Sequence, residues 1–310
     1  MPSLEAVATY LPDQRVPVEQ VVRELGLPTM QAKLLRRFLG LGEIRLDPVG
    51  TLYELLAAAV QNLEALRGRE GQVRYVLHAR AMPVGVPYPV NELRRLCEAY
   101  GLRHAVSFSV THNACASGLL ALHLAGRLLA EDAEPGTLAL VLTGEKAFTR
   151  DAQFVPGMSV FGEGSAACLV SADGQRDRVL SYAALTRGEF DGRLDELPEL
   201  AARFEREYPD LLAAVLHEAV ANAGLTLDDI ALILPHNVNT MSWQRLCRKI
   251  SFPAGQVLLS NTPLTGHVFC ADTFINYRTA TTRGLLRPGD RYLFAAAGLG
   301  ATFAAMVVEH

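Results

Sequence analysis

Apolar residues along the chain follow two spacings, one typical of amphipathic helices and one of buried strands. Helical spacing covers 51–66, and a strand-like segment follows at 73–83. The same order returns later, with helical spacing over 208–225 and an apolar run over 230–239. This alternation predicts a mostly parallel sheet whose two faces are both covered by helices.

A second pair of segments indicates that the chain is built from two similar halves. Residues 117–145 and 271–300 each contain a helical pattern, a Pro-Gly turn and an apolar strand that leads into a glycine. The polar segment 171–178 lies between the halves and has the composition of a connecting loop. We therefore predict an N-terminal half over 1–172 and a C-terminal half over 173–310, with two sheets packed through shared helices.

Composition excludes several classes of protein. The chain has 310 residues, of which 50% are hydrophobic, and a net charge of −4, so it can bury a large core. This charge is not that of a nucleic-acid-binding protein, and no apolar run approaches the roughly 20 residues that span a bilayer. The N-terminal residues lack the basic start and apolar centre of a signal peptide. We expect a cytoplasmic protein that binds neither nucleic acid nor membrane.

The cysteines do not form a recognisable metal or disulfide pattern. There are five, an odd number, and they are widely spaced without a C-x-x-C pair. They are Cys97, Cys115, Cys168, Cys247 and Cys270. We expect no metal site, and most of these cysteines to be small buried hydrophobic residues.

Cys115 has different surroundings from the other four cysteines. It follows the apolar run 106–110 and precedes a helical pattern, with the small residues Ala114, Ser117 and Gly118 close by. A thiol at the start of a helix faces unpaired amide hydrogens and the positive end of the helix dipole, which favour the reactive thiolate. Small neighbours give a substrate carbonyl access to the sulfur. A plain buried cysteine is the alternative interpretation.

A histidine occupies a similarly suggestive position in the second half. His236 directly follows the apolar strand 230–235, within the run Pro-His-Asn-Val-Asn. Parallel strands present functional groups at their carboxyl ends, so His236 is a candidate active-site residue. The alternative is a hydrogen-bonded structural histidine.

Four short motifs in order along the chain resemble those of one enzyme family. They are NACASG at 113–118, FGEGSAACLV at 161–170, PHNVN at 235–239 and GLGATF at 298–303. The chain resembles the β-ketoacyl-acyl-carrier-protein synthase III enzymes of the thiolase-fold superfamily. This resemblance implies an α/β, thiolase-like, five-layered αβαβα fold made of two pseudo-repeated halves.

The resemblance also assigns roles to individual residues. Cys115 would accept an acyl group as a thioester, and the backbone N–H groups of Cys115 and Gly300 would form the oxyanion hole. His236 matches the catalytic histidine of the family, and Asn239 ends the same motif and would contact substrate. Tyr88 matches an aromatic residue that reaches across a homodimer interface to line the partner's acyl pocket. A loop tyrosine with its hydroxyl in water is the alternative for Tyr88.

The third catalytic residue of the family, an asparagine, is replaced in this chain. Counting back without gaps from the Pro-Gly turn at 288–289 places the family's Gly-Asn on Gly266 and His267. Asn261 is the alternative, but it needs a gap on each side. The predicted site is Cys-His-His, with both histidines about 3–5 Å from the sulfur.

This replacement bears on the reaction. Histidine and asparagine can both donate a hydrogen bond to a thioester oxygen, and elongating ketosynthases with a similar site decarboxylate malonyl units. In another branch of the family, loss of this asparagine accompanies loss of decarboxylation, and the acyl group passes to an alcohol, an amine or another acceptor. Ala301, where the family commonly has phenylalanine, would leave room for a bulky acceptor.

We therefore predict a ketosynthase III-like acyltransferase of natural-product biosynthesis. An ordinary decarboxylative synthase, which condenses acyl-CoA with malonyl carrier protein, is the alternative. A non-catalytic partner subunit is a third class, which the intact Cys115, His236 and Gly300 argue against.

Basic residues indicate where the acyl donor would enter. The acyl donor would be an acyl-CoA or the acyl-phosphopantetheine of an acyl-carrier protein. Both are substrates, and we expect no cofactor. Because both carriers are anionic, cations near the entrance would attract them. The candidates are Arg36, Arg37, Arg150, Arg245, Arg248 and Lys249. Ordinary solvent-exposed helix faces are the alternative interpretation.

Overall fold

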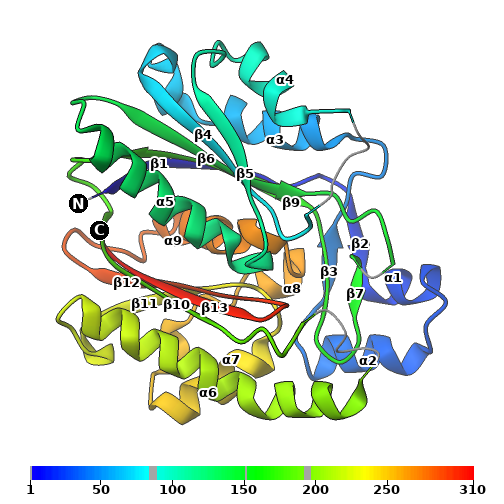
Figure 1. Ribbon diagram of the computed structural model, residues 1–310. Helices are drawn as coiled ribbons and strands as arrows, with labels where there is room; N and C mark the ends of the chain where they lie inside the picture. The colour runs from blue at the N-terminus through cyan, green and yellow to red at the C-terminus, as the bar shows by residue number, and fades with distance from the viewer. Residues whose placement is uncertain (1, 84–88, 151, 192–196) are drawn as a thin grey trace.

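The computed structural model describes residues 2–83, 89–150, 152–191 and 197–310. Figure 1 shows five layers, with two sheets separated by a central pair of helices and covered by helices on their outer faces. The outer layer of the first sheet contains α3 (Leu52–Gln61) and α4 (Glu92–Ala99). The central layer contains α5 (Ser117–Asp132) and α9 (Asp272–Thr282). The outer layer of the second sheet contains α6 (Pro198–Asn222) and α7 (Thr240–Ile250). This is the predicted five-layered αβαβα arrangement.

The two sheets are joined at one point. The first has the order β1-β9-β6-β4-β5 and the second β11-β12-β13-β10, and a single residue pair between β1 and β10, Ser3 with Arg178, connects them. The strands of the first are β1 (Ser3–Tyr10), β4 (Val73–Ala79), β5 (Val106–Val110), β6 (Leu138–Glu145) and β9 (Gly164–Ser171). Those of the second are β10 (Arg178–Thr186), β11 (Ile230–Pro235), β12 (Arg291–Gly298) and β13 (Thr302–Glu309).

The two sheets have matching internal plans. In the first, β4 and β6 are parallel and β9 follows antiparallel to β6. In the second, β11 and β12 are parallel and β13 follows antiparallel to β12. The central helices α5 and α9 occupy the same place in the two series, as the repeated sequence pattern predicts. The exact division at 172/173 stays a prediction, although it falls between the end of β9 and the start of β10.

The prediction of a mostly parallel sheet is wrong. β4 is parallel to β5 and β6, and β11 to β12, but the other pairings in the two sheets are antiparallel. Three residues connect β12 to β13, too few for the crossover that a parallel neighbour requires. Because all of these strands are buried, their apolar pattern does not reveal their direction.

Two predicted helices have different limits in the structure. α3 begins after Thr51, whose hydroxyl accepts from the backbone of Glu54 while the Glu54 carboxylate accepts from Thr51, and it ends at Gln61. α6 starts at Pro198, ten residues before the predicted 208, and continues through Pro209. The predicted start came from the apolar spacing over 208–225, and Pro209 lies inside α6 although proline is most common in the first turn of a helix. The longer helix places Phe204 and Tyr208 on one face, next to the C-terminal sheet.

A close approach of the central helices brings the two halves of the site together. Gly118, in the first turn of α5, lies so near Cys270 that a Cβ added to it would be 2.9 Å from the Cys270 carbonyl oxygen. The short 3₁₀ turns before the helices, Ala114–Ala116 and Phe269–Ala271, therefore lie side by side. The first carries Cys115, and His267 lies just before the second.

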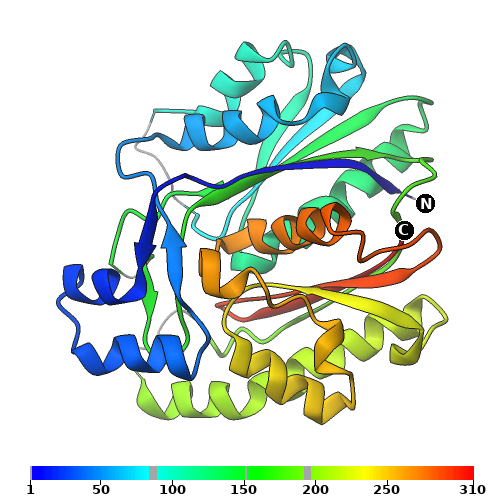
Figure 2. The same cartoon turned by 180° about the vertical axis from the view of Figure 1, so that it is seen from behind.

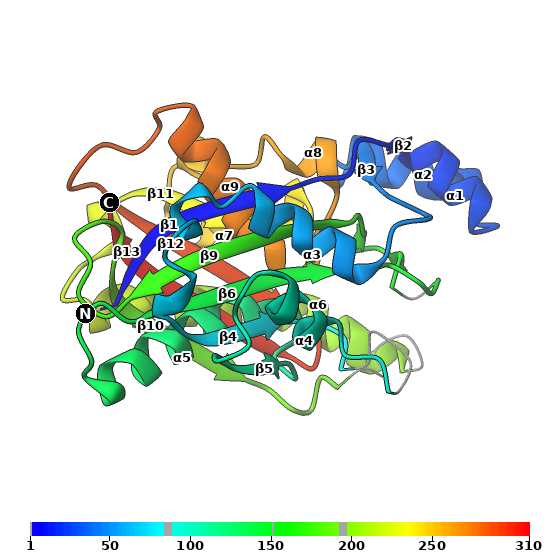
Figure 3. The same ribbon diagram turned by 90° about the horizontal axis from the view of Figure 1, so that it is seen from above.

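A smaller substructure lies beside the sheets, as Figure 2 shows in blue. It contains β2 (Arg15–Pro17), α1 (Val18–Glu24), α2 (Thr29–Arg37) and β3 (Glu43–Arg45). Figure 3 shows α1 and α2 at the end of the molecule opposite both chain termini. It contacts the second half directly, because the backbone of Thr240 donates a 2.9 Å hydrogen bond to Leu39.

The fold also contains two short strands, β7 (Phe154–Val155) and β8 (Ser159–Val160), and the short helix α8 (Thr262–Thr265). Within the described ranges, every helix is too short or too polar to span a bilayer.

Candidate active site

Cys115 lies in a strained turn between β5 and α5. The preceding residue, Ala114, has a φ of 44°, which is uncommon for a residue with a side chain. The 3₁₀ turn that contains Cys115 continues directly into α5 at Ser117. The thiol is largely buried, with 9% of the residue exposed, and it lines a cavity. The local structure is therefore the strand-to-helix junction that the sequence predicts.

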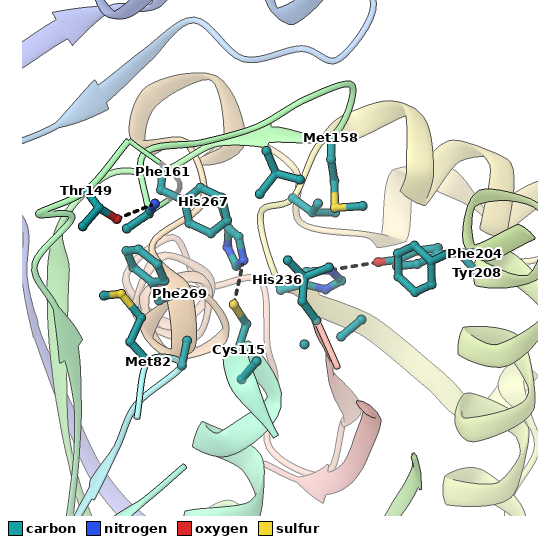
Figure 4. Close-up of a pocket in the computed structure, with 18 residues that line it drawn as sticks. Met82, Cys115, Thr149, Met158, Phe161, Phe204, Tyr208, His236, His267 and Phe269 are labelled. Carbon is teal, nitrogen blue, oxygen red and sulfur yellow. Dashed lines mark hydrogen bonds between the residues drawn. The ribbon is translucent and has the colours of Figure 1, made fainter. Parts of the chain in front are cut away.

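His267 is held against Cys115 by a short backbone pairing. Its N–H donates to Val160 and its carbonyl accepts from Gly162, both at 3.0 Å, and the Phe161 ring packs 4.7 Å from the imidazole. These contacts direct Nε2 of His267 to a position 3.2 Å from Sγ of Cys115 (Figure 4). The structure thus places His267 where counting from the Pro-Gly turn placed it.

The alternative residue, Asn261, lies elsewhere. Its side chain donates to Asn276 and Thr279 of α9, both at 2.8 Å. It is not among the described residues that line the cavity around Cys115. Its contacts are those of a structural residue.

The other ring nitrogen of His267 contacts a buried carboxylate that the sequence analysis missed. Nδ1 pairs closely with Oδ2 of Asp272, the first residue of α9. Backbone N–H groups fix this carboxylate, with Val268 donating to Oδ1 at 2.7 Å and Asn237 to Oδ2 at 2.6 Å. Cys115, His267 and Asp272 therefore form a nucleophile–base–acid chain of the kind found in hydrolases and acyltransferases. The sequence signal was an acidic residue five positions after His267, in the first turn of a helix.

The charges of the two histidines differ. Burial alone lowers the pKa of His267, but the Cys115 thiolate and the Asp272 carboxylate outweigh burial and raise that pKa to about 10. Burial, and next the charge on His267, lower the pKa of His236 to about 3. At neutral pH the raised pKa favours the imidazolium form of His267, while His236 is a neutral ring.

His236 is in the site but does not hydrogen-bond the sulfur. Its ring centroid is 5.8 Å from that of His267, and its Nε2 forms a 2.9 Å hydrogen bond with the Tyr208 hydroxyl. Its carbonyl accepts from the Trp243 indole at 2.9 Å, which fixes its backbone. The prediction that both histidines are directed at the sulfur is therefore correct only for His267. The unexpected length of α6 supplies Tyr208, the actual partner of His236.

The glycine-rich turn between β12 and β13 packs on the segment that carries Cys115. A Cβ added to Gly298 would lie 2.1 Å from the carbonyl oxygen of Asn113, so only glycine allows this approach. Gly300 has a φ of 128°, a conformation that also favours glycine. Gly298 and Leu299 line the cavity, whereas Gly300 and Ala301 are not among its described lining residues.

Ala301 has a different environment from the predicted one. It is fully buried in the core of the C-terminal half, where Phe303 is also buried. Its small size therefore does not widen the acceptor side of the cavity directly. The oxyanion role of Gly300 stays a prediction.

Two adjoining cavities lie at the site, and Cys115 lines the inner one. The inner cavity has a volume of about 330 Å³ and the outer about 600 Å³. Five residues line both: Val155, Met158, Phe204, Tyr208 and Val238. On its other side the inner cavity is bounded by an apolar group consisting of Met82, Phe161 and Phe269. The outer cavity therefore adjoins the one that contains Cys115.

A buried glutamate shapes the wall that contains Met82. The Glu145 carboxylate accepts the backbone N–H groups of Ala81 and Met82, at 2.6 and 2.7 Å. Burial raises the pKa of Glu145 to about 7. The next residue, Lys146, forms a buried 2.6 Å ion pair with Glu163. Sequence reasoning identified neither acid, because no pattern marks a buried carboxylate whose partners are backbone groups.

The other predicted substrate residues have varied positions. Asn239 lines the outer cavity but also caps α7, accepting from Ser242 at 2.7 Å and donating to Met158 at 3.0 Å. Tyr88 lies outside the described residues.

Of the basic residues, only Arg245 lines a described cavity, the outer one, and it forms a 3.6 Å ion pair with Glu205. Arg36 pairs with Glu19 at 2.7 Å and Lys249 with Asp210 at 2.5 Å. The remaining three are exposed: Arg37, Arg150 and Arg248.

Known proteins resemble this chain in both sequence and structure. The sequence model of the 3-oxoacyl-[acyl-carrier-protein] synthase III C-terminal family matches residues 220–310. The β-ketoacyl-[acyl-carrier-protein] synthase III of Nitratidesulfovibrio vulgaris is 26% identical over 262 residues, 77% of each chain.

Solved structures resemble the whole chain. The 3-oxoacyl-[acyl-carrier-protein] synthase III from Aquifex aeolicus has a TM-score of 0.84 and 18% identity, with 100% of both chains covered. ChlB3, described as an acyltransferase, has a TM-score of 0.86 and 20% identity, with 99% of this chain and 97% of that chain covered. These likenesses establish the five-layered fold over the full length.

Proposed function

Because the chain is a ketosynthase III-like enzyme with the thiolase fold, we propose that it is an acyltransferase that uses Cys115 as its nucleophile. It takes an acyl group from an acyl-carrier protein or acyl-CoA and delivers it to an acceptor, in natural-product biosynthesis. The observation that carries this proposal is the chain Cys115–His267–Asp272.

The first half-reaction follows from the charges of this chain. The Cys115 thiolate attacks the carbonyl carbon of the donor thioester. The tetrahedral intermediate collapses with cleavage of the donor C–S bond, and the departing pantetheine thiolate takes the proton from Nε2 of His267. The products are an acyl-Cys115 thioester, a free pantetheine thiol and a neutral His267.

Acylation changes the base strength of His267 in the required direction. The thiolate charge is the strongest influence that raises the pKa of His267, and it disappears when the thioester forms. Burial then favours the neutral ring, which can accept a proton from an incoming nucleophile. Asp272 stabilises the imidazolium that results, as the acid of a catalytic triad does. Collapse of the second intermediate cleaves the acyl–sulfur bond and restores the thiolate–imidazolium pair.

The oxyanion of both intermediates needs hydrogen-bond donors. We assign the backbone N–H groups of Cys115 and Gly300 to this role, since the turn that contains Gly300 packs on the segment that carries Cys115.

A triad is better suited to acyl transfer than to decarboxylation. Decarboxylation of a malonyl unit requires hydrogen-bond donors aimed at its thioester oxygen. In the acyl-enzyme, however, Nε2 of His236 is bonded to Tyr208, and the neutral His267 keeps its proton on Nδ1 beside Asp272, so its Nε2 accepts rather than donates. The acyltransferase description of ChlB3 supports transfer. The synthase names of the sequence relatives make decarboxylative condensation the second candidate.

Donor binding would use the outer cavity. It shares part of its wall with the Cys115 chamber and is lined by Asn239, Ser242 and Arg245, which an incoming pantetheine arm would meet. The carrier itself would contact the exposed cations around Arg245, and we further propose that the enzyme is a homodimer.

Intact-mass spectrometry tests the proposal. The protein is mixed with acetyl-, butyryl- and octanoyl-CoA and with the corresponding acyl-carrier proteins. We expect the mass to rise by one acyl group with a suitable donor, and Cys115→Ala to prevent the increase. Cys270→Ala is the matched control, because Cys270 is a buried cysteine that does not line the described cavity. Acylation that persists in Cys115→Ala would contradict the proposal.

A further inference from the structure

The hydrogen bond between Tyr208 and His236 has no role in the Cys115–His267–Asp272 chain. Tyr208 belongs to α6 and His236 follows β11, and their hydroxyl and Nε2 are 2.9 Å apart. In Figure 4 the His236 ring lies between Cys115 and the Tyr208 hydroxyl. Both residues line the inner cavity, so the pair faces the same space as the nucleophile.

The neighbours of Tyr208 fix its position. Its ring makes edge contacts with Phe204 and Phe303, at centroid distances of 5.6 and 5.4 Å. Such packing leaves few alternative rotamers for the phenol. The hydroxyl is therefore presented to the cavity from a rigid wall.

The protonation of the pair follows from which nitrogen lacks a partner. Nδ1 of His236 is buried and makes no hydrogen bond in the described structure, and the nearby Ala295 carbonyl instead accepts the backbone N–H of His236 at 2.9 Å. A buried N–H without an acceptor is less tolerable than a bare nitrogen lone pair, so the proton of the neutral ring belongs on Nε2. His236 then donates to the Tyr208 oxygen, and the phenolic hydrogen is directed elsewhere. Among the described residues, that hydrogen has no recorded acceptor.

Tyr208 lies at the boundary between the two cavities. It lines both of them, so a molecule that moves from the outer cavity to the sulfur would pass the phenol. The inner cavity has no carboxylate among its described lining residues, and His236 is neutral. A neutral nucleophile suits this chamber, whereas an ammonium group would be desolvated there without a counter-charge.

We propose that the Tyr208–His236 pair binds the hydroxyl group of an alcohol acceptor, a role that rests on the acyltransferase function proposed above. The Tyr208 O–H donates to one lone pair of the acceptor oxygen. The second lone pair attacks the carbonyl carbon of acyl-Cys115, and the acceptor's own proton passes to Nε2 of His267. The acyl–sulfur bond then breaks, Cys115 leaves as the thiolate, and an ester is released. Tyr208 is thus an acceptor-binding residue, and His236 positions it.

The test measures acyl loading and acyl transfer separately, in the wild type, in Tyr208→Phe and in Tyr182→Phe. Tyr182 is the matched control, because its buried hydroxyl has no partner and it does not line either described cavity. Acyl loading from acetyl-, butyryl- and octanoyl-CoA is timed by intact mass. Decay of the acyl-enzyme is then followed with propan-1-ol, glycerol or propylamine as the acceptor.

We expect Tyr208→Phe to load its acyl group at the wild-type rate but to transfer it to the alcohols roughly 10- to 100-fold more slowly, the scale of one lost hydrogen bond in a desolvated site. Tyr182→Phe should match wild type in both steps, and propylamine should be a poorer acceptor than propan-1-ol. Each of three results would overturn this inference. Wild type and Tyr208→Phe could transfer to alcohols equally fast, Tyr208→Phe could slow both half-reactions equally, or the wild type could transfer preferentially to propylamine. Failure of every donor to load wild-type Cys115 would instead overturn the proposed function.

Discussion

Nε2 of His267 lies 3.2 Å from Sγ of Cys115, although 152 residues separate the two in sequence. Each stands at the N-terminal approach to one of the central helices, α5 and α9, and the close contact at Gly118 brings those helix ends together. The duplicated architecture therefore produces the nucleophile–base pair, with one member from each half. The reactivity of this pair depends on the groups around it.

Asp272 should matter for rate more than for fold. Asp272→Asn keeps the size of the side chain but removes the charge that pairs with Nδ1 of His267. We expect kcat/KM for acyl transfer to fall by about 10²- to 10⁴-fold, as for other triads that lose the acid. Because Asp272 raises the pKa of His267, the alkaline limb of the pH–rate profile should also move to lower pH in the variant.

Asp229→Asn is the control for Asp272→Asn, since Asp229 accepts from the backbone of Thr226 in an exposed turn. It should leave the profile unchanged. Thermal unfolding checks that both variants fold. An Asp272→Asn enzyme with the wild-type rate and pH profile would show that the carboxylate only holds the backbone of Val268 and Asn237.

The sequence could reveal one part of this site and not the other. Cys115, His236 and His267 stand at element boundaries with recognisable neighbours, so motif and spacing located them. Asp272 was missed because an acid in the first turn of a helix normally serves the helix dipole, and only tertiary packing shows that it faces an imidazole. Tyr208 was missed because no motif marks it, and its contact with His236 follows only from the packing of α6.

Strand direction was mispredicted for a similar reason. A fully buried strand has the same apolar pattern in either direction, so β9 and β13 could not be recognised as antiparallel from composition alone. The internal repeat predicted two sheets packed through shared helices, and the resemblance to the thiolase-fold enzymes implied the five layers.

Phe269 should limit the length of the acyl chain. Its ring packs 4.8 Å from Phe161 in the wall of the inner cavity, and its φ is 50°, which is strained for a bulky residue. Phe269→Gly removes the ring and suits this backbone. We expect the preferred acyl-CoA to lengthen, with each additional buried methylene worth about 0.8 kcal/mol, or roughly fourfold in kcat/KM.

Phe252→Ala is the control for Phe269→Gly, because Phe252 is buried in the C-terminal core and does not line the described cavities. It should lower stability without altering the preference. Competition between acetyl- and octanoyl-CoA measures the change. An unchanged preference in Phe269→Gly would place the end of the acyl pocket elsewhere.

Glu145 should make stability decrease as pH rises. Its carboxyl pKa is raised from 4.5 to about 7 in the folded protein, so the folded state binds a proton more tightly than the unfolded chain. This contribution is fully present below pH 4.5 and is lost as pH rises through 7, with a total of roughly 3 kcal/mol. Glu145→Gln should remove that part of the pH dependence. Urea unfolding of both proteins at several values between pH 4.5 and 8 provides the comparison, and parallel stability curves would refute this assignment.

The edge strand β5 should mediate dimer formation. It ends the first sheet and exposes Val106, an apolar edge of the kind that pairs with another chain. We expect light scattering to show a homodimer at micromolar concentration and Val106→Lys to weaken it. Val49→Lys changes another exposed valine, outside the strands, and should leave the dimer intact. A monomeric wild-type protein would exclude the dimer.

Carbon dioxide release from malonyl carrier protein tests most directly whether the Cys115–His267–Asp272 chain transfers acyl groups rather than condensing them. The measurement uses wild-type enzyme already acylated on Cys115, with Cys115→Ala and His267→Ala alongside. The account predicts that the wild type carries its acyl group and yet releases no more carbon dioxide than His267→Ala. Rapid release by the wild type that is lost in His267→Ala would contradict it and identify an ordinary chain-initiating synthase.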